Sequence, residues 1–299
     1  MSTLRLSFCA LAALVLVSGC SEDKDAADMP DAPVFLGKWG TEGHGDGQFE
    51  EIRDVAVAPN GNVYVVDHGL YTRRIEYFDA TGKYLGHWGP TDYSNYTLET
   101  PLGVAVAPNG NVYVVDQKDK VYYFKPDGEY LGEWSVDGPA CPSAIAVAPD
   151  GNVYLCLTLN DQVGYYTPTG VLLGKWGSSG PGPGHFRGAW SIDVSPGGVV
   201  YVEDSGNHRI QYFTLTGEYL GAWSIDAGGV GVSPAGGVYV GNSPTDEIYH
   251  YTAAGSFIRK WGSSGSGDGQ FRGVRGLAVA PNGYIYVADT GNFRIQYFH

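Results

Sequence analysis

Aspartates and arginines recur along the chain in matching surroundings, and they have the clearest capacity for ionic chemistry. Each aspartate ends a segment such as "VYVVD", and each arginine begins a later segment such as "RIQYF". A ring of carboxylates would be a set of calcium ligands. A carboxylate and a guanidinium on neighbouring strands would instead form a charge-assisted pair that holds a loop. We favour this structural pair, because the third of the six sequence repeats described below lacks both charges, with Leu157 and Val163 at these positions. The pairs are Asp67–Arg74, Asp204–Arg209 and Asp289–Arg294, with Lys120 as the basic residue for Asp116.

Two further arginines and a tryptophan occupy one equivalent position, just before Val- and Ala-rich segments. They are Arg53, Trp190 and Arg275. Two guanidinium groups and an indole around a common depression would bind a carboxylate, a peptide segment or a sugar. The alternative is that the arginines pair with nearby aspartates while Trp190 plugs the central channel. Those aspartates are Asp54, Asp67 and Asp289.

Patterns for covalent or metal catalysis are missing from the sequence. It contains no G-x-S-x-G, and the stretch "GSGDGQF" precedes a predicted strand, whereas a phosphate-binding loop needs a helix after it. The histidines occupy unlike places in their repeats, so they do not predict the converging imidazoles of a zinc site. We therefore expect no catalytic residue, no bound metal and no cofactor.

Six copies of one unit position all of these residues. Each copy begins with a segment such as "AVAPNGNVYVVD", which predicts two alternating strands (a and b) around a tight turn. A third strand (c, "RIQYF") and a fourth (d, "YLGHW") follow. Six four-stranded antiparallel units predict an all-β fold, a six-bladed β-propeller. The turn glycines are Gly61, Gly110, Gly151, Gly198, Gly237 and Gly283.

The two ends of the repeat region complement each other. The last copy stops after strand c, at "RIQYFH", while "PVFLGKWG" (33–40) resembles a fourth strand such as "VLLGKWG". An unpaired last strand would leave an exposed sheet edge. The N-terminal strand is therefore predicted to complete the C-terminal blade and close the ring.

The amino-acid sequence of the repeats resembles that of a known family. The stretch "KWGSSGSGDGQFRGVRGLAVAPNGYIYVADTGNFRIQYF" is similar to the NHL repeat, and the resemblance covers residues 33–299. NHL propellers serve as lyases, RNA-binding modules, sensor domains and protein scaffolds, so the resemblance implies the fold more strongly than a function. NHL-type peptidyl-amidoglycolate lyases hold zinc with histidines just before strand a, and this chain has no histidine there. Its residues at those positions are Arg53, Leu102, Ser143, Trp190, Gly228 and Arg275.

Residues 1–20, "MSTLRLSFCALAALVLVSGC", are typical of an export signal, because their apolar run is too short to span a bilayer comfortably. The ending "LVSGC" resembles a bacterial lipobox, which implies lipidation of Cys20; an ordinary cleaved signal is the alternative. The acidic stretch 21–32 is predicted to be a solvated tether. In the propeller (33–299), Cys141 and Cys156 are interpreted either as a disulfide or as two buried thiols.

The net charge of the chain and the lengths of its loops narrow the range of possible ligands and the face that would bind them. The chain has 18 Lys and Arg against 32 Asp and Glu, a net charge of −14, which disfavours nucleic-acid binding. The variable d–a and b–c loops share one face, where binding is expected. The shorter d–a loops of blades 3 and 5 predict a lower rim there.

We expect an exported monomer, lipid-anchored to the bacterial cell envelope at the outer membrane or facing the periplasm. Its function would be that of a non-enzymatic binding or scaffold module for a protein, a peptide or an envelope glycan, acting on the d–a/b–c face. The alternative is a metal-dependent hydrolase or lyase with its site at the axial mouth of the propeller. An RNA-binding role ranks third, because the sequence lacks a basic face.

Overall fold

The structure is a computed structural model that describes residues 32–89 and 98–299. Cys20, the predicted signal segment and the tether up to Asp31 lie outside the described residues. No helix within the described ranges is long and apolar enough to cross a bilayer.

Alternating apolar residues and glycine turns produce the strands. In the first blade, every side chain of β3 (Val63–Asp67) is buried, because Val and Tyr face the packed surfaces on its two sides. The turn before it is closed by the Gly61 N–H, which donates to the Ala58 carbonyl at 2.9 Å. Gly61 has a φ of 90°, a conformation that favours glycine.

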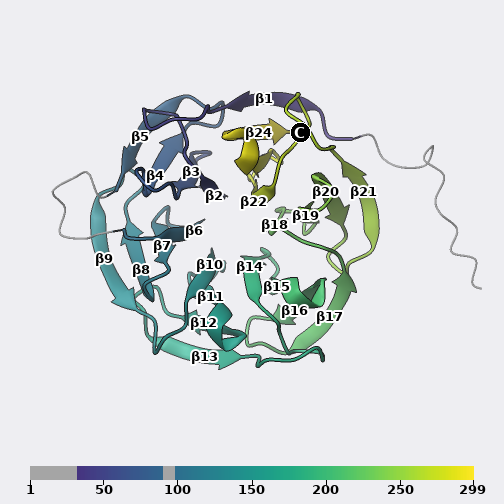
Figure 1. The fold of residues 1–299 in the computed structure, drawn as a ribbon. Coiled ribbons are helices and arrows are strands. Elements are labelled where there is room, and N and C mark those ends of the chain that lie inside the picture. Colours follow the sequence, from purple (N-terminus) through teal and green to yellow (C-terminus); the bar gives the residue numbers. More distant parts are fainter. Residues whose placement is uncertain (1–31, 90–97) are drawn as a thin grey trace, which may run out of the picture. The chain divides into compact units, whose positions relative to one another are not determined.

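The described residues form six four-stranded antiparallel sheets arranged as a ring (Figure 1), which confirms the predicted six-bladed β-propeller. Blade 1 contains β2 (Ile52–Val57), β3, β4 (Arg74–Phe78) and β5 (Tyr84–Trp88). Blade 2 contains β6 (Pro101–Val106), β7 (Val112–Asp116), β8 (Lys120–Phe124) and β9 (Tyr130–Ser135). Blade 3 contains β10 (Pro142–Val147), β11 (Val153–Leu157), β12 (Gln162–Tyr166) and β13 (Leu172–Trp176), with the short helix η2 (Thr158–Asn160).

The other three blades repeat this order. Blade 4 contains β14 (Ala189–Val194), β15 (Val199–Asp204), η3 (Ser205–Asn207), β16 (Arg209–Thr214) and β17 (Tyr219–Ser224). Blade 5 contains β18 (Gly229–Val232), β19 (Val238–Asn242), β20 (Glu247–Tyr251) and β21 (Phe257–Trp261). Blade 6 contains β22 (Val274–Val279), β23 (Ile285–Asp289), η4 (Thr290–Asn292), β24 (Arg294–Phe298) and β1 (Phe35–Trp39).

Strand β1 closes the ring, as the sequence predicts. It pairs antiparallel with β24, with Phe35 opposite Phe298 and Trp39 opposite Ile295. Beyond the strand, Val34 and His299 exchange two backbone hydrogen bonds of 2.8 and 3.0 Å. The N-terminal strand therefore covers the edge that β24 would otherwise expose.

Neighbouring blades are held together by tryptophans and tyrosines. A Cβ added at Gly82, in the c–d turn of blade 1, would lie 2.4 Å from the ring of Trp39 in the outer strand of blade 6. On the same junction, the Tyr286 hydroxyl donates to the Ala80 carbonyl at 2.9 Å. Tyr64, Tyr154 and Tyr201 make the same bond to the next blade. The blades therefore form a rigid frame for their loops.

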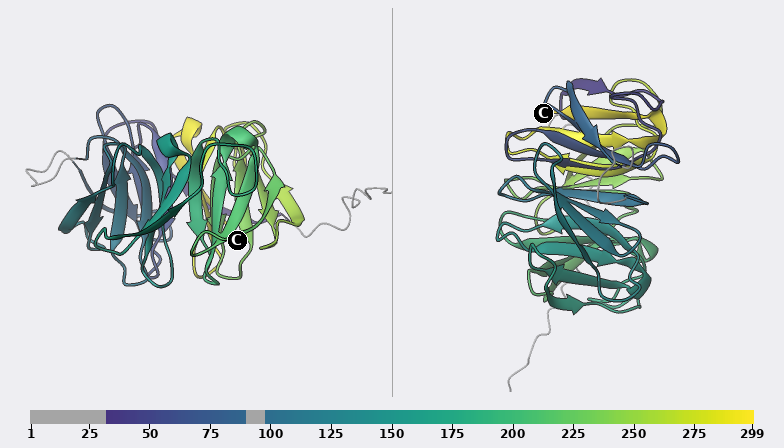
Figure 2. Two further views of the ribbon diagram at one scale, coloured as in Figure 1. Left: turned by 90° about the horizontal axis from the view of Figure 1, so that it is seen from below. Right: turned by 90° about the vertical axis from the view of Figure 1, so that its left-hand side faces the viewer.

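Strand a of each blade lies nearest the axis and strand d lies at the rim (Figure 1), while Figure 2 shows the same ring from the side. Each strand a begins at the face that carries the d–a and b–c loops. It ends at the tight a–b turns on the opposite face. The residues just before or at the start of strand a therefore surround one end of the axis, called the mouth here.

Candidate functional site

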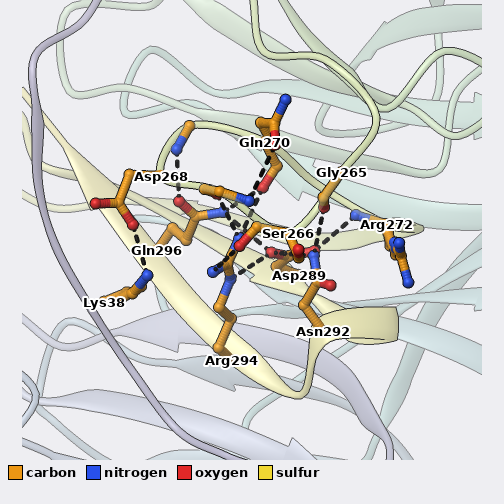
Figure 3. A network of polar contacts seen from close by, with 12 residues as sticks. Lys38, Gly265, Ser266, Asp268, Gln270, Arg272, Asp289, Asn292, Arg294 and Gln296 are labelled. Atoms are coloured by element: carbon orange, nitrogen blue, oxygen red, sulfur yellow. Dashed lines mark hydrogen bonds and ion pairs between the residues drawn. The ribbon is translucent and has the colours of Figure 1, made fainter.

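The aspartates at the ends of the b strands hold the d–a loops (Figure 3). The Asp289 carboxylate accepts hydrogen bonds from the Arg272 N–H and Arg294 Nε, both at 2.7 Å, and from Asn292 Nδ2 at 2.9 Å. Arg294 in turn donates to the loop carbonyls of Ser266, Gly267 and Gln270. The carboxylate is fully buried and surrounded by donors, as expected of a structural clamp.

The same arrangement recurs in blade 4 and is altered in blade 1. Asp204 accepts from Arg209 Nε at 2.7 Å and from the Arg187 N–H at 2.7 Å. In blade 1, Arg74 lies 3.6 Å from Asp67 and only 2.8 Å from Glu76. Burial raises the pKa of Glu76 to about 8, although the Arg74 charge opposes this rise.

Two details of the predicted pairs differ in the structure. Lys120 pairs with Glu133 on β9, while Asp116 accepts backbone N–H groups from Glu99 and Thr100. In blade 3, the residue opposite Leu157 is Gln162, because the register places Val163 opposite Cys156.

The interpretation of Cys141 and Cys156 as a disulfide is wrong for this structure, in which both thiols are free. Cys156 is buried and packs against blade 4, away from Cys141. Cys141 precedes β10, and its N–H is fixed by the Asp119 carboxylate at 2.8 Å. The alternative of two buried thiols holds for Cys156, whereas Cys141 is partly exposed.

A channel of about 380 Å³ runs along the axis, lined by the a strands. Two carboxylates lie in it and connect adjacent blades. Asp54 accepts from the N–H groups of Val55 and, in blade 2, Val104, at 2.9 and 3.0 Å. Asp193 does the same with Val194 and, in blade 5, Val232, at 2.8 and 2.7 Å. Burial raises the pKa of Asp54 to about 7 and that of Asp193 to about 6.

The three residues predicted to bind a ligand line one cavity at the mouth, with a volume of about 360 Å³. Arg53, Trp190 and Arg275 reach it from blades 1, 4 and 6. Arg275 Nη1 donates to Glu51 Oε1 at 2.8 Å, and Arg53 Nε lies 3.8 Å from the same oxygen. The acidic partner of both arginines is therefore Glu51, and not one of the three aspartates considered from the sequence.

Trp190 lines both the axial channel and the mouth cavity, and 44% of its surface is exposed. Its backbone carbonyl accepts a hydrogen bond from Ser143 Oγ at 3.0 Å, which fixes the start of β14 beside blade 3. Burial lowers the pKa of Arg53, and the nearby charge of Arg275 adds to this effect. The guanidinium groups of Arg53 and Arg275 are therefore close enough to interact electrostatically, and they line the same cavity as the exposed indole of Trp190.

Sequence reasoning missed Glu203, which lines the same cavity. Only 1% of Glu203 is exposed; its Oε1 accepts from Ser205 Oγ at 3.1 Å, and its Oε2 has no hydrogen-bond partner among the described residues. Burial raises its pKa to about 8. A signal was present, because the other blades have small or apolar residues at this position: Val66, Val115, Cys156, Gly241 and Ala288.

The side chains that could ligate a metal are dispersed over the described part of the chain. The described residues contain no group of three His, Cys, Asp or Glu side chains placed to hold an ion. None of the described residues that line the mouth is a histidine. His68, on the b–c loop of blade 1, instead contacts the Pro101 carbonyl at 3.0 Å through Nδ1.

Comparisons with known proteins agree with this architecture. The NHL repeat family matches residues 186–213 and 271–298. These two segments are thus NHL repeats within the six-bladed β-propeller that the described residues form. No curated protein matches it in sequence.

Solved structures share the fold at low sequence identity. A streptogramin B lyase aligns with a TM-score of 0.61 and 14% identity, over 89% of this chain and 97% of that chain. Virginiamycin B lyase from Staphylococcus aureus aligns with a TM-score of 0.59 and 12% identity, over 87% and 94%. Hydrazine synthase from Kuenenia stuttgartiensis aligns with a TM-score of 0.61 and 11% identity, over 86% and 97%. At these identities the likeness concerns the fold alone.

Proposed function

We propose that this NHL-repeat propeller is a non-enzymatic recognition module that binds a protein, peptide or glycan ligand at the mouth. The observation that carries the proposal is the meeting of Arg53, Trp190 and Arg275 in one cavity, although they come from three different blades. Nothing in the packing of the ring requires an indole that is 44% exposed. Such a surface is typical of a binding site.

The charges at the mouth favour an acidic group on the ligand. Arg53 and Arg275 share the single carboxylate of Glu51, so the cluster keeps a net positive charge. The chain as a whole has a net charge of −14. A local positive site on an acidic molecule selects anionic groups by position, because the surrounding surface repels them.

The setting we propose for this module is the bacterial cell envelope. The lipobox-like ending at Cys20 and the acidic stretch 21–32 support a lipid-anchored, exported protein. Such a protein would present its d–a/b–c loops to envelope components.

Capture from a cell-envelope extract tests the proposal. The wild-type protein and a variant with Arg53→Ala, Trp190→Ala and Arg275→Ala are immobilised, and the retained species are compared by mass spectrometry. We expect a species retained by the wild type and lost in the variant. As a matched control, Lys38→Ala removes an exposed cation far from the axis and should retain the same species. Equal retention by the triple variant would move the site elsewhere.

A metal-dependent lyase or hydrolase is the second candidate, because three of the similar structures are lyases and Glu203 places a carboxyl with one unpaired oxygen at the mouth. One similar structure is a histidine-to-alanine virginiamycin B lyase described as catalytically inactive, in complex with quinupristin. The described lining residues of this mouth include no histidine, which favours the binding module. Mass spectrometry of metal content, with melting temperatures before and after EDTA, separates the two. A stoichiometric metal whose removal lowers the melting temperature would favour the enzyme.

A further inference from the structure

The junction between blades 4 and 5 differs from the other blade junctions in its packing. In the other blades the d–a connection inserts a fully buried apolar side chain into the junction: Phe49, Leu98, Ala140, Phe186 and Phe271. Four of these pack with the preceding blade's residue at the position of Glu203; Phe49, for example, shares a cluster with Ala288. The connection into blade 5 is short, because β17 ends at Ser224 and β18 begins at Gly229. At this junction, which is fully described, the connection supplies Ile225, which is 8% exposed and shares a cluster with Ile210, and the partly buried Ala227, but no side chain that is fully buried.

Glu203 lies at this junction and lines the cavity together with Ala227. Its Oε2 is buried without a hydrogen-bond partner among the described residues, which is a costly state for a carboxyl group. A valine, as at Val66 and Val115, would avoid that cost. Packing and stability therefore do not explain the glutamate, whereas a bound ligand that pairs with Oε2 does.

The cavity around Glu203 offers two chemically different ends. At one end, in blade 4, Glu203 accepts from the Ser205 hydroxyl, whereas Ser243 Oγ donates to the Val274 carbonyl beside Arg275 at 3.3 Å. At the other end are the guanidiniums of Arg53 and Arg275. The Cys156 thiol on β11 is a titratable group near Glu203, and burial raises its pKa well above the usual range.

We infer that the mouth takes a small organic acid that carries hydroxyl or amide groups, with its carboxylate at Arg53 and Arg275 and a polar group hydrogen-bonded to Glu203 Oε2. This inference rests on the proposed function and names the ligand class for the same site. A cavity of about 360 Å³ suits a single sugar acid or the last residues of a peptide, and both sources supply this chemistry. A protonated Glu203 both donates and accepts, so it matches either a hydroxyl or an amide.

Titration calorimetry on the purified full chain tests the inference with three probes. D-Glucuronate represents the sugar acids, the dipeptide Ala-Ala represents peptide ends, and D-glucose is the neutral control. We expect saturable binding of at least one acid and at least tenfold weaker binding of glucose. Glu203→Val should weaken binding at least tenfold. Glu203→Gln should change it less than threefold, because the amide keeps both a donor and an acceptor.

A matched control separates the site from general effects of buried carboxyls. Glu76→Gln changes a buried carboxyl outside the mouth to the residue found at the same place in blades 4 and 6, Gln211 and Gln296. It should leave binding unchanged. Binding that is lost in the double variant Arg53→Ala and Arg275→Ala but kept in Glu203→Val would overturn the inference and leave the proposed function standing. Failure of both acids to bind the wild type would overturn the ligand class, while the capture experiment still tests the proposed function separately.

Discussion

Glu203 keeps its proton at neutral pH because burial penalises the charged form and only one hydroxyl compensates. Its pKa is about 8 in the folded chain and near its ordinary value of 4.5 in the unfolded chain. Between these values the folded protein holds a proton that the unfolded chain releases. The contribution of Glu203 to the free energy of unfolding is therefore largest at low pH, and it is lost as the pH rises through that window.

The variant Glu203→Gln removes this titration. We expect its free energy of unfolding, relative to wild type, to rise by at least about 1 kcal/mol between pH 5 and pH 9. Urea denaturation at pH 5, 7 and 9 measures the difference. Comparison with the wild type is essential, since Glu76, Asp54 and Asp193 titrate in the same direction and persist in both proteins. Parallel pH curves for the two proteins would show that Glu203 does not hold the proton.

The clamp at Asp289 leads to a second prediction at the scale of the residue. Asp289→Ala leaves the Arg294 guanidinium buried without its carboxylate, so we expect a loss of about 3 kcal/mol in the free energy of unfolding. The control is Asp268→Ala, which breaks the ion pair between Asp268 and Lys38. The two side chains are 55% and 44% exposed, respectively. That change should cost less than about 1 kcal/mol. Equal losses in the two variants would contradict the clamp.

Strand β1 joins the chain's first and last blades, so its packing contributes to the whole ring. Trp39 contacts Phe78 of blade 1 and Tyr286 and Tyr297 of blade 6. We expect Trp39→Ala to lower the free energy of unfolding by about 3–5 kcal/mol. Trp190→Ala, at the exposed indole, should change it by less than about 1 kcal/mol. Thermal denaturation of both variants makes the comparison, and similar melting temperatures would show that β1 does not latch the ring.

The strands and the ring closure could be predicted from sequence because they depend on local periodicity and turn chemistry. The spare strand 33–40 was recognisable as a fourth strand, and it pairs with β24. Side-chain partners across blades were harder to predict. Glu51 bridges Arg53 and Arg275 because the closed ring brings blades 1 and 6 together, and sequence distance gives no hint of this contact.

At the mouth, too, features that depend on local sequence could be predicted, whereas contacts between blades could not. The meeting of Arg53, Trp190 and Arg275 in one cavity could be predicted because they share one repeat position, and the short d–a loops of blades 3 and 5 predict a lower rim there. Glu203 was missed because a glutamate in "VYVED" resembles an ordinary polar residue. It faces the cavity at the junction with blade 5, where the connecting segment places the small, partly buried Ala227. The role of such a residue depends on which side chains the neighbouring blade places around it, and a single repeat does not show them.

At the scale of the molecule, the proposed anchor makes a clear prediction. Cys20→Ser removes the thiol that would carry the lipid, so the variant should leave the membrane fraction. Expression in a bacterial host, followed by fractionation and detergent phase partition, measures this. Cys141→Ser changes a free thiol within the propeller and is the matched control, expected to stay with the membrane. Wild-type protein in the soluble fraction would indicate an ordinary cleaved signal, and a Cys20→Ser variant that stays with the membrane would contradict the lipid anchor.

The pairing of β1 with β24 also determines how the propeller responds to mechanical force. Any pull on the chain ahead of residue 33 enters the ring through β1, whose hydrogen bonds with β24 run from Phe35 to Trp39. A pull along the strand axis loads these bonds in shear, so they share the force, whereas a pull across the strand would open them one at a time. The strand that closes the ring therefore also transmits tension from the N-terminal segment to blade 6.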